Sequence, residues 1–295
     1  MIGIVTVLYN CAPVLDEFFQ TLNEQTYKDF ILYVIDNKSS DNSLEEADRL
    51  SQTVDFKSVM LPQEENGGVA RGNNIGIKAA LDDRCDYVLL ANNDIVLESD
   101  TIEKLLEGMN RYGVTMAVPK IYVWGKENLI WAVGGKFLWL KGTTKHIGAR
   151  VIDEGQFDYD YPITYAPTCF MLINANIFLQ YGMMDEKFFV YYDDTDFVWR
   201  TVKIGKEKMY YIYSSRIYHK VSFSTGGTLS DFAIKFFNRN QIYFVMKHFG
   251  WFHRFVVFSF LLTKLLLKDI WRFDKKQINL MLNSYREGFL LYKEG

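Results

Sequence analysis

Hydrophobic residues in the first hundred positions follow two alternating spacings. Short runs rich in β-branched residues, which are typical of buried strands, are separated by stretches whose apolar side chains recur every three or four positions, as on a helix face. The expected strands are residues 2–8, 30–35, 54–60 and 86–90, and the expected helices are residues 14–25, 44–50 and 70–81. Strands that alternate with helices at short intervals predict a parallel sheet with right-handed crossovers.

Polar residues cluster where the expected strands end. Asn10 follows the first strand, Asp36 follows the second, and Asn92-Asn93-Asp94 closes the fourth. In open α/β sheets, ligands bind outside the carboxyl ends of the strands. The pattern therefore predicts a ligand site at this edge of the sheet.

Two of these polar segments suit a nucleotide, although each has an ordinary structural explanation. The Asp36 carboxylate could accept hydrogen bonds from a base or a ribose, or could simply hold a turn. The segment Asn66–Gly76 contains four glycines, which allow close backbone approach at the start of a helix, where phosphate is favoured. It is neither a P-loop nor the dinucleotide fingerprint, because the required Gly-Lys-Ser/Thr and spacing are missing. Tight helix packing explains the glycines equally well.

Carboxylates supply the candidate chemistry. The oxygens of Asn92-Asn93-Asp94 suit a hard cation such as Mg²⁺ or Mn²⁺, or merely form a polar turn. Asp193, Asp194 and Asp196 lie among aromatic residues, and their mutual repulsion is expected to raise at least one pKa, as a general base requires. A solvated acidic turn is the alternative. His219 follows this acidic segment after a pair of apolar strands.

Composition narrows the class of protein. The 295 residues are 49% hydrophobic and 23% charged, which indicates a globular chain, and the net charge of −3 argues against nucleic acid as a partner. Three scattered cysteines, Cys11, Cys85 and Cys169, favour neither a disulfide framework nor a zinc site and fit a reducing compartment. The N-terminus is expected to be a strand and not a signal peptide. No uncharged apolar run is long enough to predict a membrane-spanning helix.

Together these segments resemble glycosyltransferase family 2, whose members have the GT-A fold. The resemblance covers about residues 2–225 and is carried, in order, by Thr6–Asn10, Val34–Asp41, Asn66–Gly76, Leu89–Asp94, Asp185–Arg200 and His219. In two places the chain departs from the usual pattern. Only the last Asp of the Asp-x-Asp metal motif persists, as Asp94, and Asp193 replaces the Glu of the acidic motif.

The resemblance implies a function and roles for individual residues. Asp194 is the expected catalytic base, and Asp94 with His219 is expected to hold Mn²⁺ or Mg²⁺. The expected substrate-binding residues are Asn10, Asp36, Asn66, Arg71, Asn74, Asn93, Asp193 and Arg200. The implied reaction is inverting transfer of a sugar from a nucleotide diphosphate donor, such as dTDP-rhamnose or a UDP-sugar, to a saccharide or lipid-linked acceptor. General likeness to rhamnosyltransferases suggests a role in surface polysaccharide synthesis.

The same resemblance sets the expected domains. Residues 1–225 are expected to form an α/β GT-A catalytic domain with a mixed sheet flanked by helices. Its first half, residues 1–97, would bind the nucleotide sugar, and its second half, residues 98–225, the acceptor. Residues 226–295 are expected to be a C-terminal amphipathic helical extension. Within it, Arg239-Asn240 resembles a pair found after the catalytic domain in this branch, and no role follows from the sequence.

The C-terminal extension has its own charge pattern. Residues 232–276 contain nine Lys or Arg against two Asp, and the apolar stretch within them is too charged to span a membrane. Such a segment suits a helix lying on an anionic membrane surface. Packing against the catalytic domain and a homodimer interface are equally open. The expected location is cytoplasmic, with peripheral contact at the inner face of the plasma membrane.

Two other functions fit parts of the sequence. A nucleotidyltransferase shares a metal and an α/β nucleotide fold, but it should carry a basic phosphate-binding loop near the N-terminus, and no Lys or Arg precedes Lys28. A catalytically inactive sugar-binding or scaffold protein is compatible with the single-Asp metal motif. Detectable turnover of a donor would separate an enzyme from such a scaffold.

Overall fold

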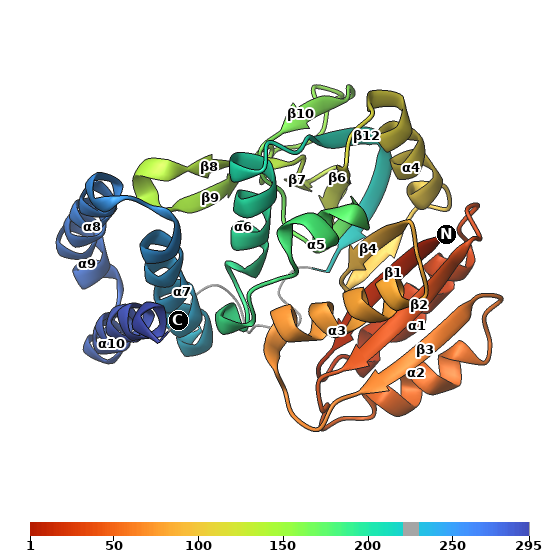
Figure 1. Ribbon diagram of the computed structural model, residues 1–295, viewed down its shortest axis with the longest axis horizontal. Helices are drawn as coiled ribbons and strands as arrows, with labels where there is room; N and C mark the ends of the chain where they lie inside the picture. Colours follow the sequence, from red (N-terminus) through yellow and green to blue (C-terminus); the bar gives the residue numbers. More distant parts are fainter. Residues whose placement is uncertain (221–229, 295) are drawn as a thin grey trace.

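The computed structural model describes residues 1–220 and 230–294 and consists of a large sheet, helices on both of its faces, and a layer of C-terminal helices at one end (Figure 1). The expected domain boundary between residues 225 and 226 lies outside the described residues. The described helices include none long and apolar enough to cross a membrane.

The first hundred residues alternate between strands and helices, as the hydrophobic spacing predicts. The elements are β1 (Ile2–Leu8), α1 (Ala12–Asn23), β2 (Phe30–Asp36), α2 (Ser43–Ser51), β3 (Lys57–Pro62), α3 (Gly68–Asp82) and β4 (Tyr87–Ala91). The four strands pair in parallel, in the order β4-β1-β2-β3. The third strand begins three residues later than expected, because residues 54–56 belong to the turn before it.

The second half extends the same sheet with strands of both directions. Its elements are β5 (Ile95–Leu97), α4 (Thr101–Tyr112), β6 (Met116–Val123), β7 (Ile130–Ala132), β8 (Gly135–Leu138), η1 (Trp139–Lys141), β9 (Thr143–His146), β10 (Tyr161–Ile163), β11 (Phe170–Asn174), α5 (Asn176–Tyr181), η2 (Glu186–Phe188), α6 (Asp193–Val198), η3 (Trp199–Ile204) and β12 (Met209–His219). β11 runs antiparallel between β4 and β6, so the sheet is mixed, as expected.

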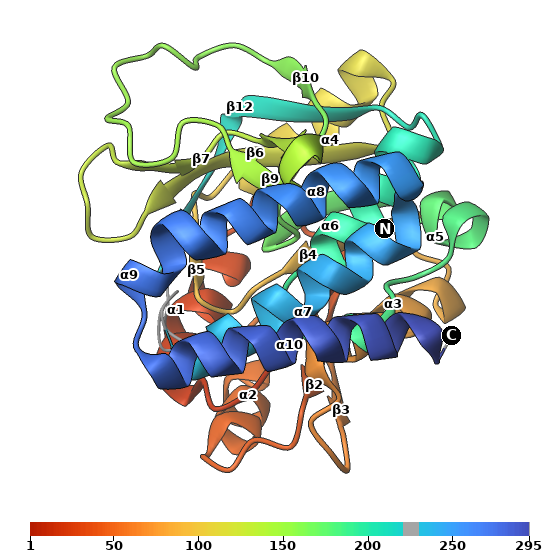
Figure 2. The ribbon, with the colours of Figure 1, turned by 90° about the vertical axis from the view of Figure 1, so that its left-hand side faces the viewer.

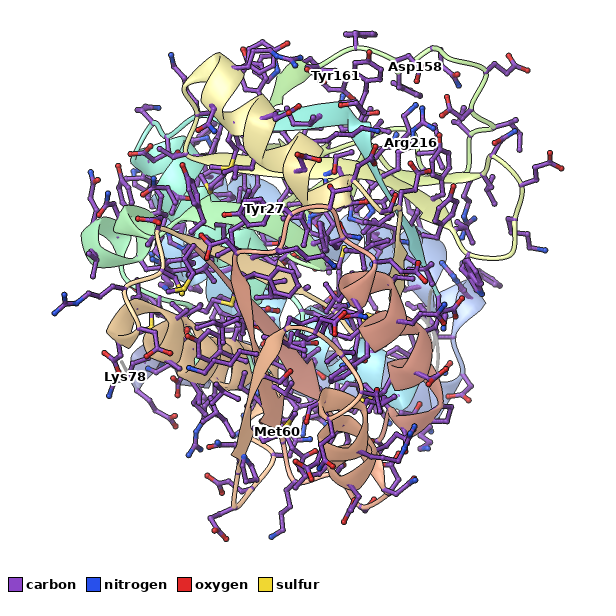
Figure 3. All side chains as sticks on the ribbon, turned by 90° about the vertical axis from the view of Figure 1, so that its right-hand side faces the viewer. Tyr27, Met60, Lys78, Asp158, Tyr161 and Arg216 are labelled. Atoms are coloured by element: carbon purple, nitrogen blue, oxygen red, sulfur yellow. The ribbon has the colours of Figure 1, made fainter. Side chains whose placement is uncertain are left out.

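The full strand order is β10-β12-β6-β11-β4-β1-β2-β3, with β5 paired to β12 and β7 paired to β6. Figure 3 shows the two ends of this order, with Met60 on β3 at one end and Tyr161 on β10 at the other. β8 and β9 form a separate hairpin. The three cysteines are buried and free.

The C-terminal helices form a third layer with its own apolar core. They are α7 (Asp231–His248), α8 (Trp251–Lys264), η4 (Leu265–Asp269), α9 (Ile270–Arg272) and α10 (Lys275–Lys293). α8 and α10 lie on the outer side of this layer, with α7 behind them (Figure 2). The core of the layer includes Phe188 and Tyr192, which precede the acidic motif, so the extension packs directly against the expected catalytic segment.

Glycines set how closely α3 approaches the sheet. A Cβ atom added at Gly72 would lie 2.7 Å from Val7 Cγ1, and one at Gly76 would lie 2.4 Å from Val5 Cγ1. Both distances are too short for real contacts, so the helix can occupy this position only without side chains there. This close packing also fixes the segment that leads into α3.

We therefore expect Gly76→Ala to destabilise the protein by about 1–3 kcal/mol, because the added methyl group overpacks a tight core. Gly250→Ala is the matched control, since its added Cβ meets nothing within 4 Å and its φ of −71° suits any residue. The control should change stability by no more than about 0.5 kcal/mol. Urea unfolding followed by circular dichroism measures both variants, and equal losses would contradict the packing account.

Candidate functional site

Two strand-end residues shape the loop that follows β2. Asp36, the last residue of β2, is buried and accepts a hydrogen bond of 3.1 Å from the backbone N–H of Ser39. Asn10 has a left-handed backbone with φ of 51°, and its side-chain oxygen accepts from the N–H of Ser40 at 2.7 Å. Both side chains thus stabilise one loop at the carboxyl edge of the sheet, where the sequence places the ligand site.

Asn93 and Asn74, two of the other expected binding residues, make contacts with the protein itself. The Asn93 amide donates to the Val7 carbonyl at 2.8 Å, which joins the ends of β4 and β1. Asn74 is buried in α3, and both its amide nitrogen and its oxygen bond to the backbone of Met184. These two asparagines therefore hold segments together, and any ligand contact by them stays a prediction.

Asn66 and Arg71 lie at the beginning of α3. The Asn66 oxygen accepts from the N–H of Gly68 at 2.9 Å, and Arg71 forms an exposed ion pair of 2.6 Å with Glu65. The next N–H, that of Val69, donates to the carbonyl of Phe189 at 2.6 Å. Two of the first N–H groups of this helix are thus bound to protein atoms, so its glycine-rich start docks against the segment before the acidic motif.

Asp94 and His219 face each other as the sequence predicts. β5 pairs with the end of β12, which brings the Asp94 Oδ1 atom within 3.2 Å of the His219 Nε2 atom. Both side chains are buried, yet within the described residues neither Asp94 Oδ1 nor either ring nitrogen of His219 has a partner in hydrogen-bonding geometry. Unpartnered buried polar atoms are costly and indicate a missing ligand.

A divalent cation fits this pair. Mg²⁺ is commonly held by one or two protein carboxylates and completes its shell with waters and substrate phosphates, and imidazole suits several transition metals. Within residues 1–220 and 230–294, no third His, Cys, Asp or Glu joins Asp94 and His219 to form a full cage. The donor set therefore suits an ion shared with a substrate and not a closed structural site.

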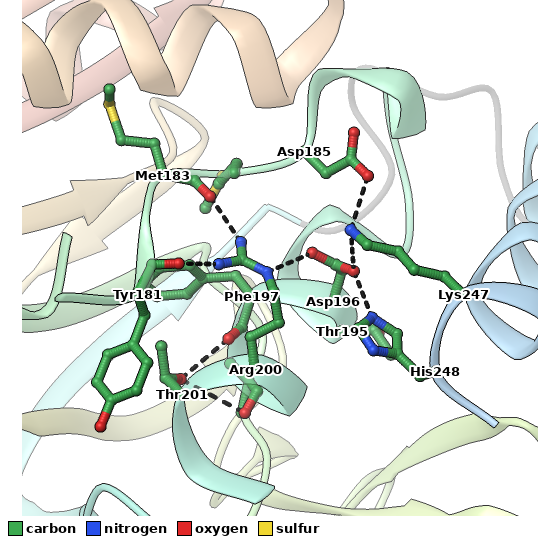
Figure 4. Close-up of polar contacts among 12 residues, drawn as sticks. Tyr181, Met183, Asp185, Thr195, Asp196, Phe197, Arg200, Thr201, Lys247 and His248 are labelled. Carbon is green, nitrogen blue, oxygen red and sulfur yellow. Dashed lines mark hydrogen bonds and ion pairs between the residues drawn. The ribbon is translucent and has the colours of Figure 1, made fainter. Parts of the chain in front are cut away.

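The acidic motif contains three carboxyl groups in different environments, and Asp196 is the one that lies among Arg200, Lys247 and His248 (Figure 4). It is fully buried and lies 2.8 Å from Arg200, 2.8 Å from Lys247 and 2.6 Å from His248. Burial alone would raise its pKa, but the hydrogen bond from His248 and the charges of Lys247 and Arg200 hold the pKa well below its ordinary value. Asp196 is therefore a permanently ionised anchor.

Arg200, which the sequence analysis assigns to substrate binding, is occupied by this anchor. Its Nε atom bonds to Asp196, and its two terminal nitrogens donate to the carbonyls of Tyr181 at 2.5 Å and Met183 at 2.6 Å. These bonds use the guanidinium as a brace between α6 and the loop after α5. A contact of Arg200 with substrate stays a prediction.

Asp193 and Asp194 have the opposite electrostatic character. Burial raises the pKa of Asp193 to about 8, and the adjacent charge of Asp194 adds to the shift. Burial also raises the pKa of Asp194, although the hydroxyl of Tyr165 at 2.6 Å and Thr195 partly offset it by hydrogen bonding. A carboxylate with a raised pKa, held in one orientation, has the properties of a general base.

A series of aromatic rings connects the Asp94–His219 pair to Asp194. Trp131 lies 4.7 Å from His219 and 4.7 Å from His146, measured between ring centroids. His146 stacks on Tyr165 at 6.1 Å, and Tyr165 donates to Asp194. Cys169 lies near both carboxylates. Burial raises the pKa of its thiol most, and the charges of Asp94 and Asp194 raise it further. Packed rings therefore connect the two candidate centres.

The sequence analysis missed the support given by α7. The loop before the acidic motif has left-handed backbone at Phe189, Tyr191 and Tyr192, an uncommon conformation for bulky residues. The amide nitrogen of Asn240 lies within hydrogen-bonding distance of three carbonyls in it, at 2.7 Å from Phe188, 2.8 Å from Val190 and 2.8 Å from Tyr191. Arg239 donates to the carbonyls of Lys187 and Phe188. These contacts show that Arg239 and Asn240 support the loop before the acidic motif, a role that does not follow from the sequence.

We expect Asn240→Ala to lower stability by about 1–3 kcal/mol and to loosen residues 187–192, because their carbonyls lose a buried donor. Asn238→Ala is the matched control on the same helix. Its amide donates to the Ile234 carbonyl, within α7, so its loss should cost less and leave the loop unchanged. Urea unfolding and hydrogen exchange of residues 187–192 measure the difference, and equal protection in both variants would refute the role of Asn240.

Comparison with known proteins gives the family. A family model described as "Glycosyl transferase family 2" matches residues 3–182. The glycosyltransferase GlyG of Streptococcus pneumoniae is 24% identical over 184 residues, which are 60% of this chain and 58% of that protein. An N-acetylglucosaminyl-diphospho-decaprenol L-rhamnosyltransferase of Mycobacterium tuberculosis is 22% identical over 278 residues, which are 85% of this chain and 86% of that protein.

A solved structure supports the fold. The crystal structure of GalNAc-T7 with UDP, GalNAc and Mn²⁺ has a TM-score of 0.68 at 12% identity, and the match covers 98% of this chain and 56% of that one. At this identity the likeness concerns the fold alone, which is the GT-A fold expected from the sequence. Because the family model spans more than half of the 295 residues, from the first strand to the end of α5, the chain belongs to glycosyltransferase family 2.

Proposed function

We propose that the chain is an inverting, metal-dependent hexosyltransferase. Its donor would be dTDP-rhamnose or a UDP-sugar, and its acceptor a saccharide or lipid-linked saccharide in surface polysaccharide synthesis. Membership of the family supports transfer from a nucleotide sugar, and the name of the mycobacterial relative, which covers most of both chains, supports rhamnose and a lipid-linked acceptor. The observation that carries the proposal is the connection of Asp194 to the Asp94–His219 pair through packed rings.

Asp194 would act as the base in a single displacement. Its carboxylate removes the proton from the acceptor hydroxyl while that oxygen attacks the anomeric carbon from the side opposite the leaving diphosphate, which inverts the configuration. The hydroxyl of Tyr165 holds its Oδ2 atom, and the backbone N–H and hydroxyl of Thr195 hold its Oδ1 atom, so the carboxylate is fixed in one orientation. A positioned base of this kind contributes about 10²–10⁴ in rate. Asp193, buried beside it, would contact the substrate.

Asp94 and His219 would hold the cation. A bound Mn²⁺ or Mg²⁺ would neutralise the charge that builds on the departing diphosphate. Their unpartnered buried atoms support this assignment, and the Mn²⁺ named with GalNAc-T7 is consistent with it. Asp94 immediately precedes β5 and His219 is the last residue of β12, so the pairing of these two strands would set the position of the diphosphate.

The remaining expected contacts belong to the donor. Asp36 would read the base or ribose, since it is buried at the carboxyl end of β2 and retains oxygen lone pairs beyond its own turn. Asn10 and Arg71 would line the same pocket.

The location and assembly of the chain are part of the proposal. We propose that it acts in the cytoplasm, with peripheral contact to the inner face of the plasma membrane through residues 232–276. A homodimer through the same region is the alternative, and an inactive sugar-binding scaffold is the alternative to the enzyme as a whole. Family membership disfavours a nucleotidyltransferase.

The proposed function predicts metal-dependent release of nucleotide diphosphate from one donor. The purified protein is incubated with Mn²⁺ or Mg²⁺ and a panel of UDP-, dTDP- and GDP-sugars, and both product release and thermal shift are followed. Asp94→Ala should abolish metal-dependent release, because it removes the only carboxylate of the cation pair. Glu46→Ala is a control on the Arg49 ion pair of α2, which has no assigned role in the site, and should retain release. If no nucleotide diphosphate stabilises the protein in the presence of metal, the scaffold becomes the better explanation.

A further inference from the structure

The C-terminal helices divide the basic segment 232–276 into an inner and an outer part. α7 is inner, because it lies between α8 and α6 and buries half of its residues, including Asn238, Asn240 and Gln241 (Figure 1). α8 is outer, and within it only Val257 and Leu261 are buried. Any contact with another body through this segment therefore falls on the outer side of α8 and on the residues that follow it.

Large apolar side chains are exposed along that outer side. Trp251 is 80% exposed and Phe255 is 67% exposed, and Leu262 lies on the same face of the helix because residues spaced by four and seven positions share a side. The exposed apolar residues continue through Leu266 and Leu267 to Trp271, which is 85% exposed. We call these six residues the α8–α9 face. Contiguous exposed apolar surface of this kind marks an interaction site.

The hairpin β8–β9 packs against α8 on the side away from this face and leads toward the proposed catalytic base. The turn η1 at its tip carries Trp139 and Leu140, both about half exposed, and the Trp139 ring lies 5.1 Å from that of His253 in α8. The backbone carbonyl of Gly142, which follows η1, accepts a hydrogen bond from the hydroxyl of Tyr192. Tyr192 lies two positions before Asp194. The apolar surface and the proposed base are thus held by the same short hairpin.

The charge around the face selects its partner. Residues 250–276 contain six Lys or Arg and two Asp, a net charge of +4, while the whole chain carries −3 and the remainder therefore −7. Arg272 directly follows Trp271, and the side chains of Arg272 and Lys275 are both exposed. Two copies of the chain meeting through this face would oppose two positive regions, which disfavours a symmetric dimer. An anionic surface is complementary to it.

From these observations we propose that the α8–α9 face binds the surface of an anionic lipid bilayer. Trp, Phe and Leu side chains would enter the boundary between head groups and acyl chains, and the flanking Lys and Arg would contact anionic head groups. The proposal deepens and rests on the proposed function, because docking by this face would present a lipid-linked acceptor near the hairpin that leads to Asp194.

Vesicle binding tests the proposal directly. The full chain is sedimented with vesicles of phosphatidylglycerol and phosphatidylcholine in equal parts, and separately with phosphatidylcholine alone. The wild type should bind the anionic vesicles and bind the neutral ones much more weakly, with binding reduced by salt. The double variant Trp251→Gln, Phe255→Gln should bind anionic vesicles about tenfold more weakly or worse, because two large side chains no longer enter the lipid. Arg272→Glu, Lys275→Glu should lose the preference for anionic lipid.

Leu179→Gln is the matched control, since Leu179 on α5 is 72% exposed but lies outside the face. It should bind like the wild type, and thermal unfolding checks that all variants are folded. Unchanged binding by the double variant, or no binding by the wild type, would overturn the proposal. Sedimentation velocity adds a further outcome: a wild-type dimer that the double variant converts to monomer would assign the face to a second copy of the chain and also overturn it.

Donor turnover separates this proposal from the one on which it rests. Release of nucleotide diphosphate from the donor panel is measured on the same proteins without vesicles, and the double variant should match the wild type because its substitutions are remote from the site residues. A wild type that binds anionic vesicles but turns over no donor would defeat the proposed function and leave the lipid-binding face in place. A wild type that turns over a donor but binds no vesicles would support the proposed function and overturn the lipid-binding face.

Discussion

The buried ion network around Asp196 is the interaction on which the catalytic segment depends. A fully buried carboxylate is costly unless it is paired, and here Arg200, Lys247 and the ring of His248, from two parts of the chain, surround it. Arg200 comes from the turn after α6, while Lys247 and His248 come from the last turn of α7. Lys247 also bonds to Asp185 at 2.7 Å, ahead of the motif. The network therefore fixes both ends of the acidic segment to the C-terminal helix.

This anchoring separates the roles of three neighbouring carboxylates. Asp196 is held ionised by its partners, whereas Asp193 and Asp194 form no ion pair within the described residues, and burial raises their pKa values. The backbone between Phe188 and Tyr192 adopts left-handed conformations, and the donors of Arg239 and Asn240 offset the cost of holding it there. The C-terminal extension is thus part of the site, and residues outside the family-model match help to position the proposed base.

The sequence predicted the elements that depend on local patterns. Alternating apolar spacing predicted the first four strands and three helices, because burial on a sheet and on a helix face repeat with different periods. The Asp94–His219 contact followed from family resemblance, and the structure places the two side chains together through β5 and β12. The packing role of Gly72 and Gly76 was also anticipated as one of two alternatives.

The rest depended on contacts between residues distant in sequence. Nothing local distinguishes Asp196 from Asp194, because the basic groups that separate them lie 51 and 52 residues further along at Lys247 and His248. For the same reason Arg200 was assigned to substrate, although its guanidinium bonds to Asp196 and two carbonyls. The role of Asn240 required knowing which backbone carbonyls face it.

The central claim is that Asp194 acts on the substrate while Asp196 acts on the protein. Comparing Asp194→Asn with Asp196→Asn tests it most directly, with donor binding by thermal shift and transfer rate measured on each. Asp194→Asn should lower transfer by about 10²–10⁴ and leave donor binding and stability nearly unchanged. Asp196→Asn should lower stability, donor binding and transfer together, because it leaves the partly buried Arg200 and Lys247 without their counter-charge. Equal loss of donor binding and transfer in Asp194→Asn would contradict the account and assign that residue a structural role.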